Sequence, residues 1–268
     1  GPYRDRGAFD RVASAYSGLT YVSGEPERPP VRSGYAVIDF MAAYLAAFAT
    51  VTALYDRDQH GGAGQIIDLA LYEAGFRSSE NALLAHSALG QVRERLGNRN
   101  PGIAPASDFG TADGRRISLH AGTESLFRRL CQVIGHPELL DDARFAERVA
   151  RLAHQDELYA LIDRWVADLD ADEAVRILND AGVPAAPIMS IADIAADPHY
   201  RERGTFLTVT DDDYGELPMV APLPHMSGTP GRIRSLGPEL GQHTDEILAE
   251  ILGLDHTSIE QLRTDGVI

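Results

Sequence analysis

The chain has 268 residues, which is enough for one large domain or two modest ones. Hydrophobic residues make up 44% and charged residues 24%, so collagen-like, coiled-coil and wholly disordered proteins are excluded. A net charge of −16 disfavours binding to nucleic acid or to anionic membranes. The single cysteine, Cys131, cannot form an intrachain disulfide, and no secretory signal is recognisable. We therefore expect a cytoplasmic globular protein.

The first part of the chain predicts a loop and then one long helix. Turn formers and the prolines that end it indicate an extended loop over Gly1–Pro30. Phe40–Tyr55 is rich in Ala and Leu and contains neither Gly nor Pro, which predicts a helix with Asp39 at its N-cap. Its apolar stretch, Phe40–Leu54, is too short to span a bilayer, so we expect a buried helix of a soluble protein.

A glycine-rich segment follows this helix. Residues 57–65 match neither the Walker nor the dinucleotide spacing, so a tight turn is favoured over a phosphate loop. Ile66–Leu71 then predicts a strand that leads into a helix over Tyr72–Leu89. Gly90–Asp108 is polar and carries several glycines and prolines, which indicates a linker or an active-site loop between two bodies.

The second part of the chain predicts a small α/β body. Asp113-Gly114, between Phe109 and Ile117–His120, is typical of a β-hairpin. Further helices and strands are predicted at Glu124–Ile134, Ala146–Leu152, Gln155–Ala167, Ala171–Ala181, Ala185–Met189, Phe206–Val209, Glu216–Val220, Thr244–Leu252 and Ser258–Thr264.

Two common kinds of active site are disfavoured by spacing. The nine histidines are scattered, and no pair or cluster with Cys131 has the spacing of metal ligands, so we expect no metal. The Gly-x-Ser-x-Gly elbow of the α/β-hydrolases is also missing.

A succession of short motifs along the chain carries a family resemblance. They are GPYRDRGAFD at 1–10, AYSG at 15–18, Asp39 before the alanine-rich helix, GQIIDLAL at 64–71, RLGN at 95–98, ADG at 112–114, DARF at 142–145, GVP at 182–184, DP at 197–198 and LGQHT at 240–244. Each is weak alone. In this order they resemble the class III CoA-transferases of the formyl-CoA transferase or CaiB-BaiF type.

The resemblance implies an acyl-CoA:carboxylate CoA-transferase in which Asp39 is the nucleophile. Taken alone, Asp39 is more simply a helix cap, but a cap and a nucleophile are compatible roles. A carboxylate can attack an acyl-CoA thioester to give a mixed anhydride and then an aspartyl-CoA thioester. Coenzyme A would be a substrate in its acylated form, with a carboxylic acid as the second partner and no metal.

Alternatives remain open at this stage. Related α-methylacyl-CoA racemases use a His and this Asp as acid and base, but the position of the His is occupied by Phe9, which cannot transfer a proton. Glu124 matches a racemase glutamate, although an acid at a helix start is commonly only a partner of the helix dipole. Tyr16, Gly97 and Asn98 are secondary candidates for residues that line a substrate or CoA site.

The family fold implies a Rossmann-type large domain that a small α/β domain interrupts, in an interlocked dimer. Mapped here, 1–100 and 196–268 belong to a partial large domain and 110–190 to the small one. Family members begin with a Rossmann-like half before the GPY run, so we expect a homodimer or a complex with a chain that supplies this half. A non-catalytic subunit that needs such a partner is a further alternative.

Overall fold

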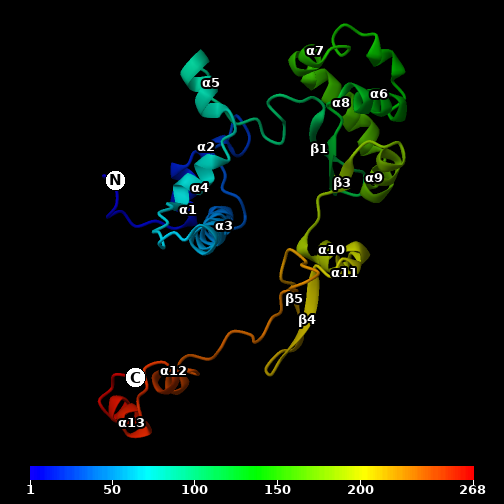
Figure 1. Cartoon of the computed structure of the whole chain (residues 1–268). Helices are drawn as coiled ribbons and strands as arrows, with labels where there is room; N and C mark the ends of the chain where they lie inside the picture. Colours follow the sequence, from blue (N-terminus) through cyan, green and yellow to red (C-terminus); the bar gives the residue numbers. More distant parts are fainter. The chain divides into compact units, whose positions relative to one another are not determined.

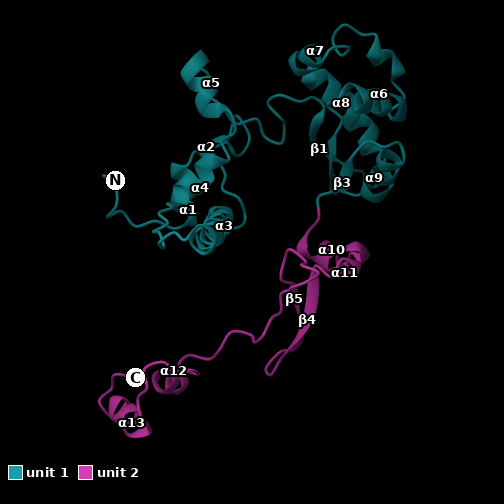
Figure 2. Ribbon diagram, in the orientation of Figure 1, with its two compact units in different colours: residues 1–188 teal, residues 189–268 magenta.

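The computed structural model describes residues 1–268, which form two compact units. Unit 1 is Gly1–Ile188 and unit 2 is Met189–Ile268 (Figure 2). Figure 1 shows the order of the elements along the chain, from the helices of the first hundred residues to the C-terminal helix pair. The predicted division at 1–100, 110–190 and 196–268 stays a prediction.

The first hundred residues are helical. The helices are α1 (Asp10–Tyr16), α2 (Leu19–Val22), α3 (Val37–His60), α4 (Leu71–Arg77) and α5 (Ala82–Leu89). The extended loop predicted over Gly1–Pro30 is wrong, because α1 and α2 lie within it. Both are too short to be stable alone, and contacts with α3 and α4 hold α1 in place, which no local pattern reveals.

The strand predicted at Ile66–Leu71 does not form. Residues 61–70 have no regular structure, and the side chain of Ile66 is 96% exposed. A strand needs a neighbour to pair its backbone groups, and no segment of this chain pairs here. The helix predicted over Tyr72–Leu89 is broken between α4 and α5, where Glu80 has a left-handed φ of 53°.

Helix α3 is longer and more exposed than its sequence suggested. It extends the predicted helix at both ends, and its most apolar window has a mean hydropathy of 1.8 with 11% of that window buried. By length and composition alone it could cross a membrane. The predictions that this segment is too short to span a bilayer and is buried are therefore wrong for this structure. Neighbours α4 and α1 cover part of α3 and leave the rest bare.

A three-stranded antiparallel sheet organises the rest of unit 1. Strands β1 (Ala106–Gly110), β2 (Arg116–His120) and β3 (Ala185–Pro187) lie in the order β1-β2-β3, which confirms the predicted hairpin and third strand. The helices that follow β2 are α6 (Glu124–Val133), the 3-10 helix η1 (Pro137–Leu140), α7 (Arg148–Ala153), α8 (Gln155–Ala167) and α9 (Ala171–Asp180). All four α-helices overlap their predicted ranges.

Unit 2 contains two helix pairs and a hairpin. They are α10 (Ile191–Ala196), α11 (Pro198–Glu202), the antiparallel strands β4 (Phe206–Asp211) and β5 (Gly215–Val220), α12 (Thr244–Glu250) and α13 (His256–Thr264). The hairpin and the last two helices were predicted, whereas α10 and α11 were not. Side chains of Ser190 and Asp197 cap these two short helices.

The strands β1–β3 and the helices α6–α9 together form the sheet-and-helix body of unit 1. Arg151 is a fully buried cation inside this body. Its guanidinium donates to the carbonyls of Ala104, Phe145 and Ala146 at 3.2, 2.9 and 3.3 Å. It also forms a two-pronged pair with the carboxylate of Glu124, at 2.7 and 3.2 Å. The hydrogen bond from Arg151 is the main reason that the pKa of Glu124 lies below its ordinary 4.5.

This pair predicts how stability depends on pH. Because the folded-state pKa of Glu124 is lowered, its contribution to the free energy of unfolding is complete above 4.5 and is lost as the pH falls through the folded value. The difference in unfolding free energy between wild type and Glu124→Gln, from urea titrations, should be constant near neutrality and shrink below 4.5.

Arg151→Met should cost about 3–5 kcal/mol at neutral pH, because buried carbonyls lose their donor. The matched control is Asp180→Asn, which breaks an exposed ion pair with Arg176 and should cost about 0–1 kcal/mol. An Arg151→Met protein as stable as this control would contradict the role of Arg151 as the donor that stabilises these buried carbonyls.

Candidate functional site

Asp39 lies in the first turn of α3. The helix begins at Val37 with Ala36 as its N-cap, so the prediction that Asp39 is the N-cap is wrong and Asp39 is the third helical residue. A carboxylate here still faces the positive end of the helix dipole. Asp39 is exposed, and its side chain takes part in no hydrogen bond or ion pair with other groups of the chain.

A second acid, Asp10, occupies the capping role at this helix start. Asp10 is 6% exposed, and its Oδ2 accepts the backbone N–H of Ile38 at 2.9 Å. Its Oδ1 accepts from Nη2 and Nε of Arg32, at 3.2 and 3.4 Å. The carboxylate of Asp10 thereby provides an acceptor for one of the amides that an α-helix leaves unpaired at its start.

Close packing holds the same turn from the other side. Ile38 is fully buried, and a methyl group on Gly75 of α4 would lie 2.5 Å from its Cδ1 and 2.6 Å from Oγ of Ser17. Gly75 therefore lets α4 approach both the start of α3 and the end of α1. The residue directly before Asp39 is fixed through its amide and through its side chain.

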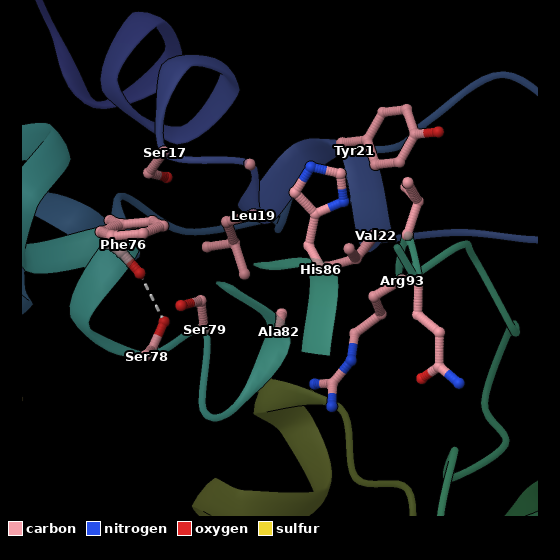
Figure 3. Close-up of a pocket in the computed structure, with 14 residues that line it drawn as sticks. Ser17, Leu19, Tyr21, Val22, Phe76, Ser78, Ser79, Ala82, His86 and Arg93 are labelled. Atoms are coloured by element: carbon pink, nitrogen blue, oxygen red, sulfur yellow. Dashed lines mark hydrogen bonds between the residues drawn. The ribbon is translucent and has the colours of Figure 1, made fainter. Parts of the chain in front are cut away.

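A cavity of about 380 Å³ opens beside this packed turn, and Ser17 and Gly75 are in its wall. Figure 3 shows Phe76 on one side and Tyr21 and Arg93 on the other. Arg93 is already paired with Glu80 at 2.7 Å. The wall of the cavity is mainly apolar, and Asp39 is not among its lining residues.

Tyr16 lines a different cavity, of about 510 Å³, next to the N-terminal segment. Its ring makes edge contacts with Tyr3 and Tyr72, with centroids 6.2 and 5.1 Å apart. Arg6 also lines this cavity and lies over the ring of Tyr3 at 3.6 Å. Aromatic faces and an arginine can hold a planar or anionic group, so Tyr16 stays a candidate for ligand binding.

The remaining candidates lie elsewhere. Gly97 has a left-handed φ of 62°, donates its amide to the carbonyl of Gly24 at 3.0 Å, and would clash with the Glu25 carboxylate if it carried a Cβ. Asn98 is exposed. Glu124 begins α6 and is held by Arg151. No hydrogen bond or ion pair links these three residues to Asp39. No group of three or more His, Cys, Asp or Glu side chains could hold a metal ion.

Asp10 and Arg32 were not singled out from the sequence. Their partners lie 28 and 22 residues away along the chain, so no local spacing connects them. Asp10 ends the GPYRDRGAFD motif, which indicates the family but no role for this residue. The one available signal is an acid at the first position of a short amphipathic segment, which is too common to mark a site.

A family comparison and two curated relatives point to the same class of proteins. CoA-transferase family III matches residues 1–244. A succinyl-CoA:D-citramalate CoA-transferase of Chloroflexus aurantiacus is 38% identical over 268 residues, all of this chain and 66% of the relative. The beta subunit of a succinyl-CoA:L-malate CoA-transferase from the same organism is 38% identical, over all of this chain and 67% of the relative.

A solved structure shows the same fold. A CaiB/BaiF family protein from Brucella suis has a TM-score of 0.77 and 31% identity, over 94% of this chain and 65% of that one. The chain thus spans about two thirds of the length of the proteins it matches. The matched motifs and these similarities lead to one conclusion: the chain belongs to CoA-transferase family III.

Proposed function

We propose that this chain is the part of an acyl-CoA:carboxylate CoA-transferase that carries the nucleophile, Asp39. The supporting observation is an exposed, unpaired carboxylate in the first turn of α3, in a chain of CoA-transferase family III. A nucleophilic carboxylate must be ionised and reachable. Asp39 lies at the N-terminal end of a helix, beside its unpaired amides, and its exposure leaves the oxygens free to attack.

The proposed reaction exchanges groups without an energy donor. Asp39 attacks the thioester carbonyl, CoA thiolate leaves, and a mixed anhydride forms. The thiolate then attacks the Asp39 carbonyl of the anhydride, which releases the donor acid and leaves an aspartyl-CoA thioester. The acceptor carboxylate attacks this thioester and again expels the thiolate. Attack of the thiolate on the acceptor's acyl carbonyl gives the new acyl-CoA and restores Asp39.

The relatives suggest a substrate class. Their names combine succinyl-CoA with citramalate or malate, which are short dicarboxylic acids that carry a hydroxyl group. We propose a short dicarboxylyl-CoA donor and a dicarboxylic acid acceptor for this protein too. Proton exchange of the racemase type is not favoured, because Phe9 offers no proton-transferring group.

We also propose that a second copy of the chain covers the bare face of α3. Phe40, Tyr44 and Phe48 on this helix are 59%, 71% and 72% exposed, and contiguous exposed apolar surface of this kind marks sites of protein or membrane contact. One relative is named as a subunit of a CoA-transferase, which supports assembly from several chains. A different protein chain and a membrane are the alternative covers.

The role of Asp39 is testable by one substitution and one trapping reaction. Asp39→Asn should lower kcat for transfer from succinyl-CoA to malate or citramalate by about a thousandfold or more, because an amide cannot form the anhydride. Hydroxylamine added during turnover should convert Asp39 of the wild type to a hydroxamate, read by peptide mass spectrometry.

The control is Asp56→Asn, which changes an exposed aspartate near the other end of α3, where it pairs with His60. It should keep wild-type kcat and still yield the hydroxamate at Asp39. A wild-type protein that transfers CoA with no hydroxamate, or an active Asp39→Asn protein, would refute the proposed nucleophile.

The cover of α3 is tested by mass and by flotation. Light scattering should give the mass of two chains for the wild type and of one chain for Phe48→Glu, because a buried glutamate at the interface carries an unpaired charge. Val149→Glu, at a position 74% exposed on α7, is the matched control and should leave the dimer intact. A monomeric wild type, a co-purified different chain, or flotation with phosphatidylcholine vesicles would contradict a second copy.

A further inference from the structure

The proposed reaction gives no step to the most buried acid of the α3 start. Asp10 is 6% exposed, and its two oxygens are divided between the amide of Ile38 and the guanidinium of Arg32. Removing a carboxylate from water is costly unless each oxygen finds a donor. Here both oxygens have one, so this carboxylate is a satisfied part of the structure and is not available to attack a substrate.

Asp10 provides what the local sequence of α3 lacks. The N-cap residue of the helix is Ala36, whose side chain has no oxygen that could accept an amide hydrogen bond. The acceptor comes instead from the first residue of α1, 28 positions earlier in the chain. The beginning of α3 is therefore tied to another helix, and its geometry depends on that tie.

Arg32 orients this tie. It belongs to the segment that leads into α3, its side chain is 29% exposed, and it contacts only Oδ1 of Asp10. With Oδ1 engaged by Arg32, Oδ2 is left to face the Ile38 amide. A guanidinium has several donors in one plane, so it can fix the direction of a carboxylate better than a single-point cation can.

We infer that Asp10 is a positioning residue for Asp39 and that Arg32 keeps Asp10 in the required orientation. Asp39 is bonded to Ile38, whose amide Asp10 holds and whose buried side chain packs closely against Gly75. Asp10 thereby acts on the nucleophile through one peptide unit. This inference rests on the proposed function, because it concerns the reach of the Asp39 carboxylate toward a thioester carbonyl.

The expected effect is on turnover and less on binding. Reacting atoms must approach to about 3–3.5 Å, and a displacement near 1 Å can cost about 100-fold in rate. Asp10→Ala removes the acceptor and should lower kcat by about 10- to 100-fold while KM for acyl-CoA changes by no more than about twofold. Asp10→Asn retains an oxygen that can accept the Ile38 amide, so its loss of kcat should be smaller.

Arg32→Gln tests the orienting role without touching the acceptor. It should lower kcat less than Asp10→Ala, and the double variant Asp10→Ala/Arg32→Gln should be no slower than Asp10→Ala, because Arg32 acts through Asp10. Asp180→Asn, which breaks an exposed aspartate–arginine pair at 3.2 Å, is the matched control and should keep wild-type kcat.

Amide hydrogen exchange supplies a readout that does not depend on activity. The peptide that contains Ile38 should exchange faster in Asp10→Ala than in wild type, with slower exchange restored in Asp10→Asn. Peptides of the sheet-and-helix body, which contains β1–β3, should not change. The experiment uses the purified full chain together with any chain that co-purifies with it.

The outcomes separate the inference from the function on which it rests. Suppose that wild type transfers CoA and that kcat in Asp10→Ala is unchanged or falls only by the fraction of protein that is unfolded. The positioning role is then refuted, and the proposed function stands. If Asp10→Ala does not fold, wild-type kcat in both Asp10→Asn and Arg32→Gln refutes it. If wild type neither transfers CoA nor forms the Asp39 hydroxamate, the proposed function fails, and the positioning role with it.

Discussion

The carboxylate of Asp10 is the constraint on which the candidate site depends. It joins three segments that are distant in the sequence: α1, the segment that carries Arg32, and the first turn of α3. Without it, α3 would begin at an alanine with no side-chain acceptor. Helix ends fray when their amides are unpaired, so the position of Asp39 would become poorly defined. At an ordinary helix cap such an interaction contributes about 1 kcal/mol, and here it would also set the position of the proposed nucleophile.

Local sequence predicted the sheet-and-helix body well because its signals are local. Each of these signals lies within a few residues of the element it predicts. Asp113-Gly114 forms a hairpin turn, α6 has an apolar face, and a polar segment precedes β1. The same rules failed where structure depends on distant partners. Helix α1 forms on α3 and α4, and Ile66–Leu71 stays irregular because nothing pairs with it.

The site could be predicted only in part, for the same reason. The order of motifs identified the family and drew attention to Asp39, which the structure places in the first turn of an exposed helix. Local propensity placed Asp39 at the N-cap position, but Ala36 occupies that position. The acid that accepts the helix amide, Asp10, was out of reach of any spacing rule, since a hydrogen bond across 28 residues leaves no periodic trace.

The buried apolar side chains are unevenly distributed, and the region around α3 has few of them. Eighteen buried residues between Phe109 and Val183 form one core, whereas the buried apolar residues among the first hundred are Ala13, Ile38, Ala42 and Ala74. Three alanines and an isoleucine bury little area, so the hydrophobic effect within the chain stabilises the sheet-and-helix body far more than the region around Asp39. Additional protein surface on α3 would stabilise the segment that carries the proposed nucleophile. Assembly and catalysis are thus expected to be coupled through this helix.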